Sequence, residues 1–237
     1  MKQSVRCLSL AASALILGAV GAFARRVYFQ NAVDAGGFLL RGHPAQIFYW
    51  VLAGVLILTA FFLSYKGQKE AGEAPSGILA GILQILLGIS LFFTAWNLDT
   101  AMSFSAALRI LGFVAAAGLM ADGGLRCAHK SGGMMASGLF CAFLLVYAVG
   151  SYSLWRSMPE MERFLTPALG TLSLLPLSCE MAAWDIGRGR SRRLMFFAAL
   201  TGFFALSALA CPGTSFLHMG AAVWSLGILF FLRGNGA

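Results

Sequence analysis

The sequence contains few charged residues. Of its 237 residues only 11% are Asp, Glu, Lys or Arg, and only nine of them are acidic. A typical soluble domain carries about 25% charged residues. Because 59% of the residues are hydrophobic and the mean hydropathy is +0.80, a water-soluble fold of this length would expose more apolar surface than it could hide. This composition excludes an ordinary soluble protein and indicates that lipid is the main solvent.

The sequence also lacks the short motifs that identify common catalytic and metal sites. No C-x-x-C, H-E-x-x-H, P-loop or G-x-S-x-G pattern is present. The five cysteines are scattered, with only Cys211 expected near an oxidising compartment, so we predict no disulfide. The three histidines are isolated from one another. We therefore predict no metal and no cofactor, and an enzyme is not favoured, although a site assembled across several helices is left open. The scattered residues are Cys7, Cys127, Cys141, Cys179 and Cys211, and His43, His129 and His218.

Nucleic acid is excluded as a partner despite the net charge of +8. A nucleic-acid-binding protein gathers its basic residues on one helix or among aromatic residues. Here the basic residues occupy short segments between apolar runs, which is typical of membrane topology.

Eight apolar runs are each long enough to form a membrane span, which takes roughly 20 residues of helix. Backbone polar groups in hydrocarbon must bond within their own segment, so the runs should be helices. We predict an all-α, polytopic membrane bundle in which residues 1–237 form a single transmembrane domain. The expected spans are 7–24, 46–65, 78–96, 101–121, 132–155, 164–184, 194–211 and 213–232.

The distribution of Lys and Arg predicts that both termini are cytoplasmic, in a multi-pass protein of the cell membrane. Eleven basic residues fall on one side of the predicted spans and five on the other. Arg25 and Arg26 fall on the less basic side and disagree with the rule. The first side holds Lys2, Arg6, Lys66, Lys69, Arg126, Lys130, Arg188, Arg190, Arg192, Arg193 and Arg233, and the second holds Arg25, Arg26, Arg41, Arg156 and Arg163.

The first span has an alternative interpretation as a signal peptide. A basic start, an apolar stretch and Ala22-Phe23-Ala24 resemble a cleavable segment of residues 1–24. We expect this segment to be retained, because the apolar run is long for a signal peptide and two arginines follow the cleavage position.

Glu180 is the first candidate binding residue, as a site for an ion or a proton. Pro176 lies one helical turn earlier and should break the helix, which frees the carbonyl of Leu172. A broken helix that presents free carbonyls beside a carboxylate binds cations in several transporters. The alternative is that Glu180 reaches the interface or the arginines that follow it.

Arg109, His218, Gln46 and His43 form the second candidate, a substrate-binding pocket that opens outward. The four residues are predicted at similar depths in the outer half of the membrane. The alternatives are that Arg109 extends to the headgroups and that the others make hydrogen bonds between helices. Deeper in the membrane, Gln84 is expected to make such a bond and Trp224 to face the interior.

Two stripes of small residues predict close helix packing, either within the chain or with a partner subunit or second copy. Gly77 and Gly81 form one stripe, and Ala14, Gly18 and Ala22 form the other.

Together these features favour a transport-related or small-solute-binding membrane protein. The first alternative is a non-catalytic structural or regulatory membrane subunit. An intramembrane enzyme that acts on lipid ranks third, because no pair of catalytic groups can be named. In every case the lipid bilayer is a partner.

Overall fold

The computed structural model describes residues 3–33, 39–40, 42–65, 77–102, 104–130, 132–156, 162–211 and 215–234. In this part of the chain the secondary structure is almost wholly α-helical, in eight helices, which confirms the predicted class and helix number. The basic residues Lys2, Arg41, Lys66 and Lys69 lie outside the described residues. The helices are α1 (Gln3–Asn31), α2 (Pro44–Tyr65), α3 (Ile78–Trp96), α4 (Ser105–Cys127), α5 (Met134–Trp155), α6 (Glu162–Asp185), α7 (Ser191–Ala208) and α8 (Phe216–Gly234).

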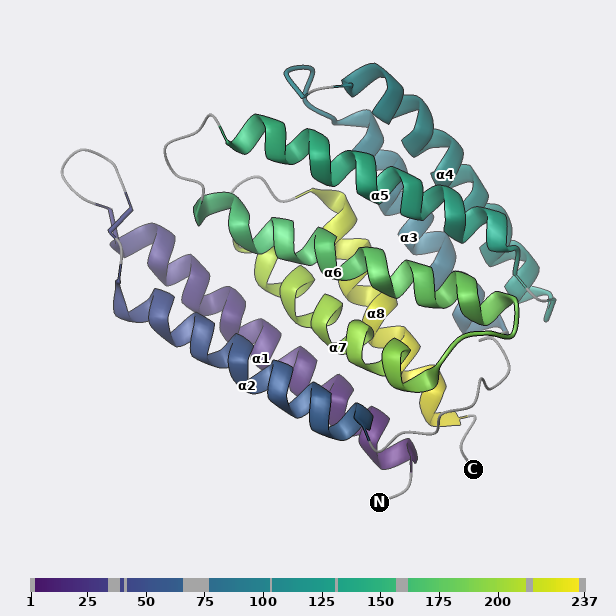
Figure 1. The fold of residues 1–237 in the computed structure, drawn as a ribbon, viewed down its shortest axis with the longest axis horizontal. Coiled ribbons are helices and arrows are strands. Elements are labelled where there is room, and N and C mark those ends of the chain that lie inside the picture. The colour runs from purple at the N-terminus through teal and green to yellow at the C-terminus, as the bar shows by residue number, and fades with distance from the viewer. Residues whose placement is uncertain are drawn as a thin grey trace.

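The helices run antiparallel to their chain neighbours and pack into one bundle (Figure 1). The hairpin of α1 and α2 covers one side, and α3, α4 and α5 cover the other. Two late helices, α7 and α8, lie between them, with α7 in contact with α1, α2, α6 and α8. The start of α1 and the end of α8 lie at the same end of the bundle (Figure 1). We call this the inner end, because the sequence predicts it to be cytoplasmic.

Helix α7 is the most enclosed element, and α2 is among the most exposed. Twelve of the eighteen residues of α7 are buried, so its small and hydroxylated side chains face protein and not lipid. On α2 the buried residues form a single stripe, repeated every three or four positions, and the other faces are apolar and exposed. Such a helix presents most of its surface to lipid.

Six helices, α1 to α6, are long and apolar enough to cross a membrane, and α8 contains a shorter apolar stretch, Phe216–Leu232. Helix α7 begins with Ser191, Arg192 and Arg193, which lowers its hydropathy. Its burial between other helices supplies the apolar environment that lipid gives the outer helices.

Several helices are longer than the predicted spans. Helix α1 continues past Ala24 to Asn31, and α4 continues past Ala121 to Cys127. The extra turns carry polar side chains, among them Arg25 and Arg126, that are buried against other helices. The predicted spans end at such residues because hydropathy scores a charged side chain as unfavourable in lipid, whether or not other helices bury and pair it.

Pro176 does not interrupt its helix, contrary to the predicted break. Helix α6 runs continuously from Glu162 to Asp185 with Pro167 and Pro176 inside it. Neighbouring helices and hydroxyl side chains stabilise a proline-containing helix. Here the Thr171 hydroxyl donates to the Pro167 carbonyl at 3.2 Å, and the Ser178 hydroxyl donates to the Leu175 carbonyl at 2.8 Å.

Both small-residue stripes face helices of the same chain. A Cβ atom at Gly81 would overlap the Cys127 sulfur and the Gly123 carbonyl of α4. A Cβ atom at Gly18 would lie 3.0 Å from the Leu206 side chain of α7. These stripes therefore serve the internal packing of the bundle.

Candidate functional site

The four residues of the predicted outer pocket occupy three separate environments. Arg109 donates to the Leu98 carbonyl at 2.7 Å, just beyond the end of α3. His218 contacts α6, and Gln46 contacts Glu162 at the start of α6. His43 lies near Gln46, with its ring 5.9 Å from that of Tyr28. The structure therefore brings Gln46 and His43 together, whereas Arg109 and His218 each contact a backbone carbonyl elsewhere, that of Leu98 and that of Pro167.

His218 joins α8 to α6 as a buried hydrogen-bonding residue. Its Nε2 atom lies 2.9 Å from the Pro167 carbonyl, which can only accept, so Nε2 must carry the proton. Its Nδ1 atom then accepts from the Ser215 hydroxyl at 3.1 Å. Both ring nitrogens are used by the protein itself, which corresponds to the predicted hydrogen bond between helices and leaves no nitrogen for a ligand.

Glu162 is the centre of a polar cluster at the outer end of the bundle. Its carboxylate accepts a hydrogen bond from the Tyr28 hydroxyl at 2.7 Å and another from the Gln46 amide at 2.8 Å. Its backbone carbonyl accepts from Arg25 at 2.8 Å. The cluster thus fastens α1, α2 and α6 together, and Gln46 is the one member that the sequence identified as a site residue.

Arg25 is buried within this cluster, with 1% of its surface exposed. Its guanidinium lies 4.7 Å from the centre of the Phe29 ring and 5.1 Å from that of Tyr49, in cation–π contact with both. The Arg25 Nε atom, the Tyr49 hydroxyl and the Thr166 hydroxyl are buried without a hydrogen-bond partner in the described structure. Arg25 and Arg26 were the two exceptions to the rule that basic residues lie on the cytoplasmic side. The burial of Arg25 explains one of them, because its charge contacts other side chains and does not face the headgroups.

A second polar network, at the inner end, was not predicted. Arg126 on α4 bonds to Asp122 at 2.9 Å and to Asp185 on α6 at 2.6 Å, with all three side chains 2% exposed or less. Asp122 also accepts from the backbone of Gly133 at 2.6 Å and from Gln84 at 3.3 Å. The network fastens α3, α4, the start of α5 and the end of α6.

Trp224 on α8 joins this network through Gln84. The indole nitrogen of Trp224 donates to the Gln84 side-chain oxygen at 2.9 Å, as a buried contact between α8 and α3. This confirms the expected interior position of Trp224 and the expected role of Gln84. The space beside Gln84, Arg126 and Trp224 is only about 10 Å³, which is about the room that one water needs. The network therefore joins helices to one another, and the space beside it is too small to bind a solute.

Glu180 is paired with the arginines that follow it in the chain. Its carboxylate accepts from the Arg193 guanidinium at 3.2 Å and from the Arg190 backbone at 3.4 Å. This is the alternative that the sequence offered to an ion-binding role. Arg190 and Arg193 also line a larger feature, the arginine groove.

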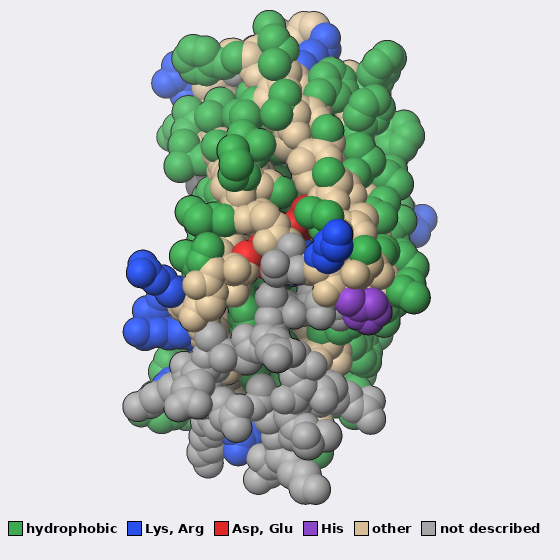
Figure 2. Space-filling model, turned by 90° about the vertical axis from the view of Figure 1, so that its right-hand side faces the viewer, with side chains coloured by type: hydrophobic (Ala, Val, Ile, Leu, Met, Phe, Trp, Pro, Cys, Tyr) green, Lys and Arg blue, Asp and Glu red, His purple; other side chains and the backbone are tan. Residues whose placement is uncertain are grey.

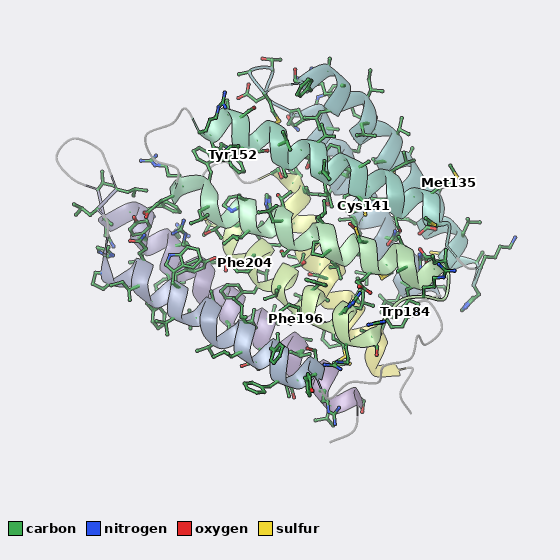
Figure 3. All side chains as sticks on the ribbon, in the orientation of Figure 1. Met135, Cys141, Tyr152, Trp184, Phe196 and Phe204 are labelled. Atoms are coloured by element: carbon green, nitrogen blue, oxygen red, sulfur yellow. The ribbon has the colours of Figure 1, made fainter. Side chains whose placement is uncertain are left out.

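The arginine groove is an open cavity of about 670 Å³ between the end of α2 and the start of α7. Arg192 lies over the Tyr65 ring, 4.3 Å from its centre. Phe196, which is labelled in Figure 3, lies deeper along α7. The groove is lined by Phe61, Ser64, Tyr65, Arg190, Arg192, Arg193, Phe196 and Phe197.

The groove combines positive charge with an apolar floor. Three arginines line it, and Glu180 is the acidic side chain that contacts one of them. Figure 2 shows one side of the molecule, on which the visible Lys and Arg side chains are scattered among apolar ones and only small areas of acidic side chain reach the surface. The groove therefore has the composition of a binding site for an anionic amphiphile.

Sequence reasoning missed Asp122, Asp185, Glu162 and the burial of Arg25. Asp122 and Arg126 lie four residues apart, which is the spacing of an ion pair on one helix face, so this pair could have been found. Glu162 and Asp185 bond to residues far along the chain, and nothing local indicates those partners.

The sequence matches no protein-family model, no curated protein and no solved structure in the comparisons made. The helices α1 to α6 have the length and composition of membrane spans. These findings describe a multi-pass, all-helical membrane protein, and any finer function has to be argued from its sites.

Proposed function

We propose that this membrane protein binds an anionic phospholipid in the arginine groove. The observation that carries the proposal is the groove itself, in which three arginines and four aromatic side chains line one open cavity of about 670 Å³. The proposed ligand is a lipid, and it therefore differs from the small solute that the sequence favoured.

The order of side chains along the two helices supports this ligand. Tyr65 is the last residue of α2 and Arg190 immediately precedes α7, so the arginines lie at headgroup level in the predicted topology. Phe61 lies four residues before Tyr65, about 6 Å deeper along the helix. A lipid phosphate would contact the arginines, and its acyl chains would extend along Phe61 and Phe196.

The aromatic contact of Arg192 supports the same ligand. The cation–π contact with Tyr65 helps to hold the Arg192 guanidinium in the groove, and its five N–H donors can still bond to a ligand. Arginine donors in this arrangement suit the oxygen atoms of a phosphate group. Arg193 shares its charge with Glu180, so we expect Arg190 and Arg192 to contribute more than Arg193.

Transport stays a prediction, because none of the contacts described above tests it. Glu180, the predicted cation site, has a cationic partner in Arg193. In the predicted outer pocket, Arg109 and His218 each contact a backbone carbonyl of the protein. The two alternative functions, a structural subunit and a lipid-directed enzyme, are both compatible with lipid in the groove.

The proposal is tested by lipid titration of the purified protein in a neutral detergent. Bound lipid is counted by native mass spectrometry for phosphatidylglycerol and for phosphatidylcholine. Each basic residue near an anionic headgroup contributes about 1 kcal/mol. The combined variant R190Q, R192Q and R193Q should therefore weaken phosphatidylglycerol binding by up to about 100-fold. Binding of phosphatidylcholine should change little.

Arg26→Gln is the matched control. Arg26 lines a groove of about 570 Å³ with Phe23 and Phe29 at the opposite end of the bundle, so its removal should leave lipid binding unchanged. Equal phosphatidylglycerol binding by the wild type and the combined variant would contradict the proposal. Competition by millimolar inorganic phosphate that displaces the lipid completely would instead indicate a soluble phosphate compound as the ligand.

A further inference from the structure

Two cysteines from neighbouring helices lie side by side in the inner half of the bundle. The sulfur atoms of Cys141 on α5 and Cys179 on α6 are 3.4 Å apart. The Cys141 sulfur also lies 3.1 Å from the Ser178 hydroxyl. Cys179 is exposed on the surface of α6 and Cys141 is half-buried beside it, in the position labelled in Figure 3. The pair is therefore reachable from the lipid side.

The separation of the sulfur atoms can be compared with the separation that each kind of bridge needs. A disulfide has about 2.05 Å between its sulfur atoms, so its formation needs movement of the side chains and also an oxidant. A single bridging atom with bonds of about 2.3 Å to each sulfur would hold them about 4.6 Å apart in a linear arrangement and about 3.8 Å apart in a tetrahedral one. Bonds that meet near a right angle give about 3.3 Å for the same bond length.

The observed 3.4 Å is a contact between two free thiols, and it is nearer to the separation that a right-angle bridge needs than to that of a linear one. Trivalent arsenic makes three bonds that meet near right angles. An organoarsenical needs only two sulfur ligands, because its organic group is the third substituent, whereas zinc takes four ligands. The position of the pair in the membrane favours the same choice, because a neutral adduct can remain in hydrocarbon, whereas a charged one is costly there.

We propose that Cys141 and Cys179 form a chelating dithiol site for trivalent organoarsenicals. In the reaction the two S–H bonds and the arsenic–oxygen double bond break. Two sulfur–arsenic bonds form, and the oxygen leaves with both protons as water. Arsenic stays trivalent and the adduct is neutral, so the step needs no oxidant and no counterion.

The site would also join α5 to α6 covalently. Cys179 lies three residues after Pro176, where α6 lacks one backbone hydrogen bond. A helix that lacks this bond can adjust its side-chain positions at low cost, which favours closure of the chelate. Capture of the arsenical should therefore fix the relative positions of the two helices.

The test uses phenylarsine oxide and the purified full-length protein. Intact-mass spectrometry should show one phenylarsenic group, with the loss of two hydrogen atoms, which survives an excess of a monothiol and is removed by 2,3-dimercaptopropanol. In the C141S and C179S variants only one sulfur–arsenic bond can form at this site. Loss of the second, tethered bond should lower retention against the monothiol by about 100-fold.

Cys127→Ser is the control variant. The Cys127 sulfur contacts the Ile78 carbonyl at 3.6 Å and does not belong to the pair of Cys141 and Cys179. This variant should retain the arsenical like the wild type, and peptide mapping should place the adduct on Cys141 and Cys179. Gel filtration and thermal unfolding of each serine variant establish that it is folded. Full retention by folded C141S or C179S, or an adduct mapped to other cysteines, would overturn the proposal.

Discussion

Arg126 holds two carboxylates out of water at the inner end of the bundle. Asp122 and Asp185 both depend on its guanidinium, and one oxygen of Asp185 is buried without a hydrogen-bond partner in the described structure. A buried ion pair adds little net stability when it is complete, but removal of one member leaves a buried, uncompensated charge. The cost of a substitution here therefore depends on which member is removed.

Substitution of Arg126 by leucine should be the most damaging single change in this network. It leaves two buried carboxylates without a cation, which we expect to lower the free energy of unfolding by about 3–5 kcal/mol. Thermal unfolding in detergent, followed by circular dichroism, measures the effect. Asp185→Asn removes one of the two negative charges and should cost less. Arg188→Gln, at an exposed position, should change stability by less than about 0.5 kcal/mol. Equal effects of the Arg126 and Arg188 variants would show that the network does not stabilise the fold.

At the scale of the helices, α3 and α4 form the closest pair of neighbours along the chain. Gly81 makes this possible, because the backbone of α4 occupies the space that a side chain would need. Gly54 on α2 is the opposite case, with no atom within 4 Å of the position of a Cβ atom. Both glycines lie within helices, and they differ in what packs against them.

Gly81→Ala should therefore destabilise the protein and Gly54→Ala should not. The added methyl group at position 81 must displace α4, at a cost of about 1–3 kcal/mol. At position 54 the same change meets no neighbour and should be neutral or stabilising by up to about 1 kcal/mol, because alanine favours the helix. The apparent melting temperatures of the two variants in detergent measure the difference. A Gly81→Ala variant as stable as Gly54→Ala would contradict the packing of α3 on α4.

The helices were predictable from the sequence to a greater extent than the sites. Long apolar runs determine where helices form, because the backbone must bond to itself in lipid. The interior position of Trp224 and the hydrogen bond of Gln84 followed from their depth alone. The partner of Arg25 could not be predicted, since Glu162 is 137 residues away. Asp122 was overlooked because it lies just after the predicted span 101–121.

The candidate site shows the same limit. Depth in the membrane placed Arg109, His218, Gln46 and His43 at one level, but depth does not determine the direction in which a side chain points. The arginines of the groove were identified as a cluster near the inner surface. Their contact with Tyr65 depends on the packing of α2 beside α7, which no local pattern contains.

At the scale of the whole molecule, the described helices begin and end at two opposite ends of the bundle (Figure 1). The predicted orientation assigns the connection from α6 to α7, with its arginines, to the cytoplasm. An epitope inserted after Arg188 should bind antibody only in permeabilised cells. An epitope inserted after Asp99, in the connection from α3 to α4, should bind antibody in intact cells with an accessible outer surface. The reverse pattern would invert the predicted topology.

The contact between α1 and α7 has a consequence for the order of events during synthesis. The Ser207 hydroxyl donates to the Gly18 carbonyl across 189 residues of chain. At about 5–20 residues per second, the ribosome delivers Ser207 roughly 10–40 s after Gly18. During that interval the side of α1 around Gly18 lacks its neighbour α7 and must be shielded by lipid or by the insertion machinery. A chain that stops before α7 would keep this face bare, and quality-control proteases could recognise it there.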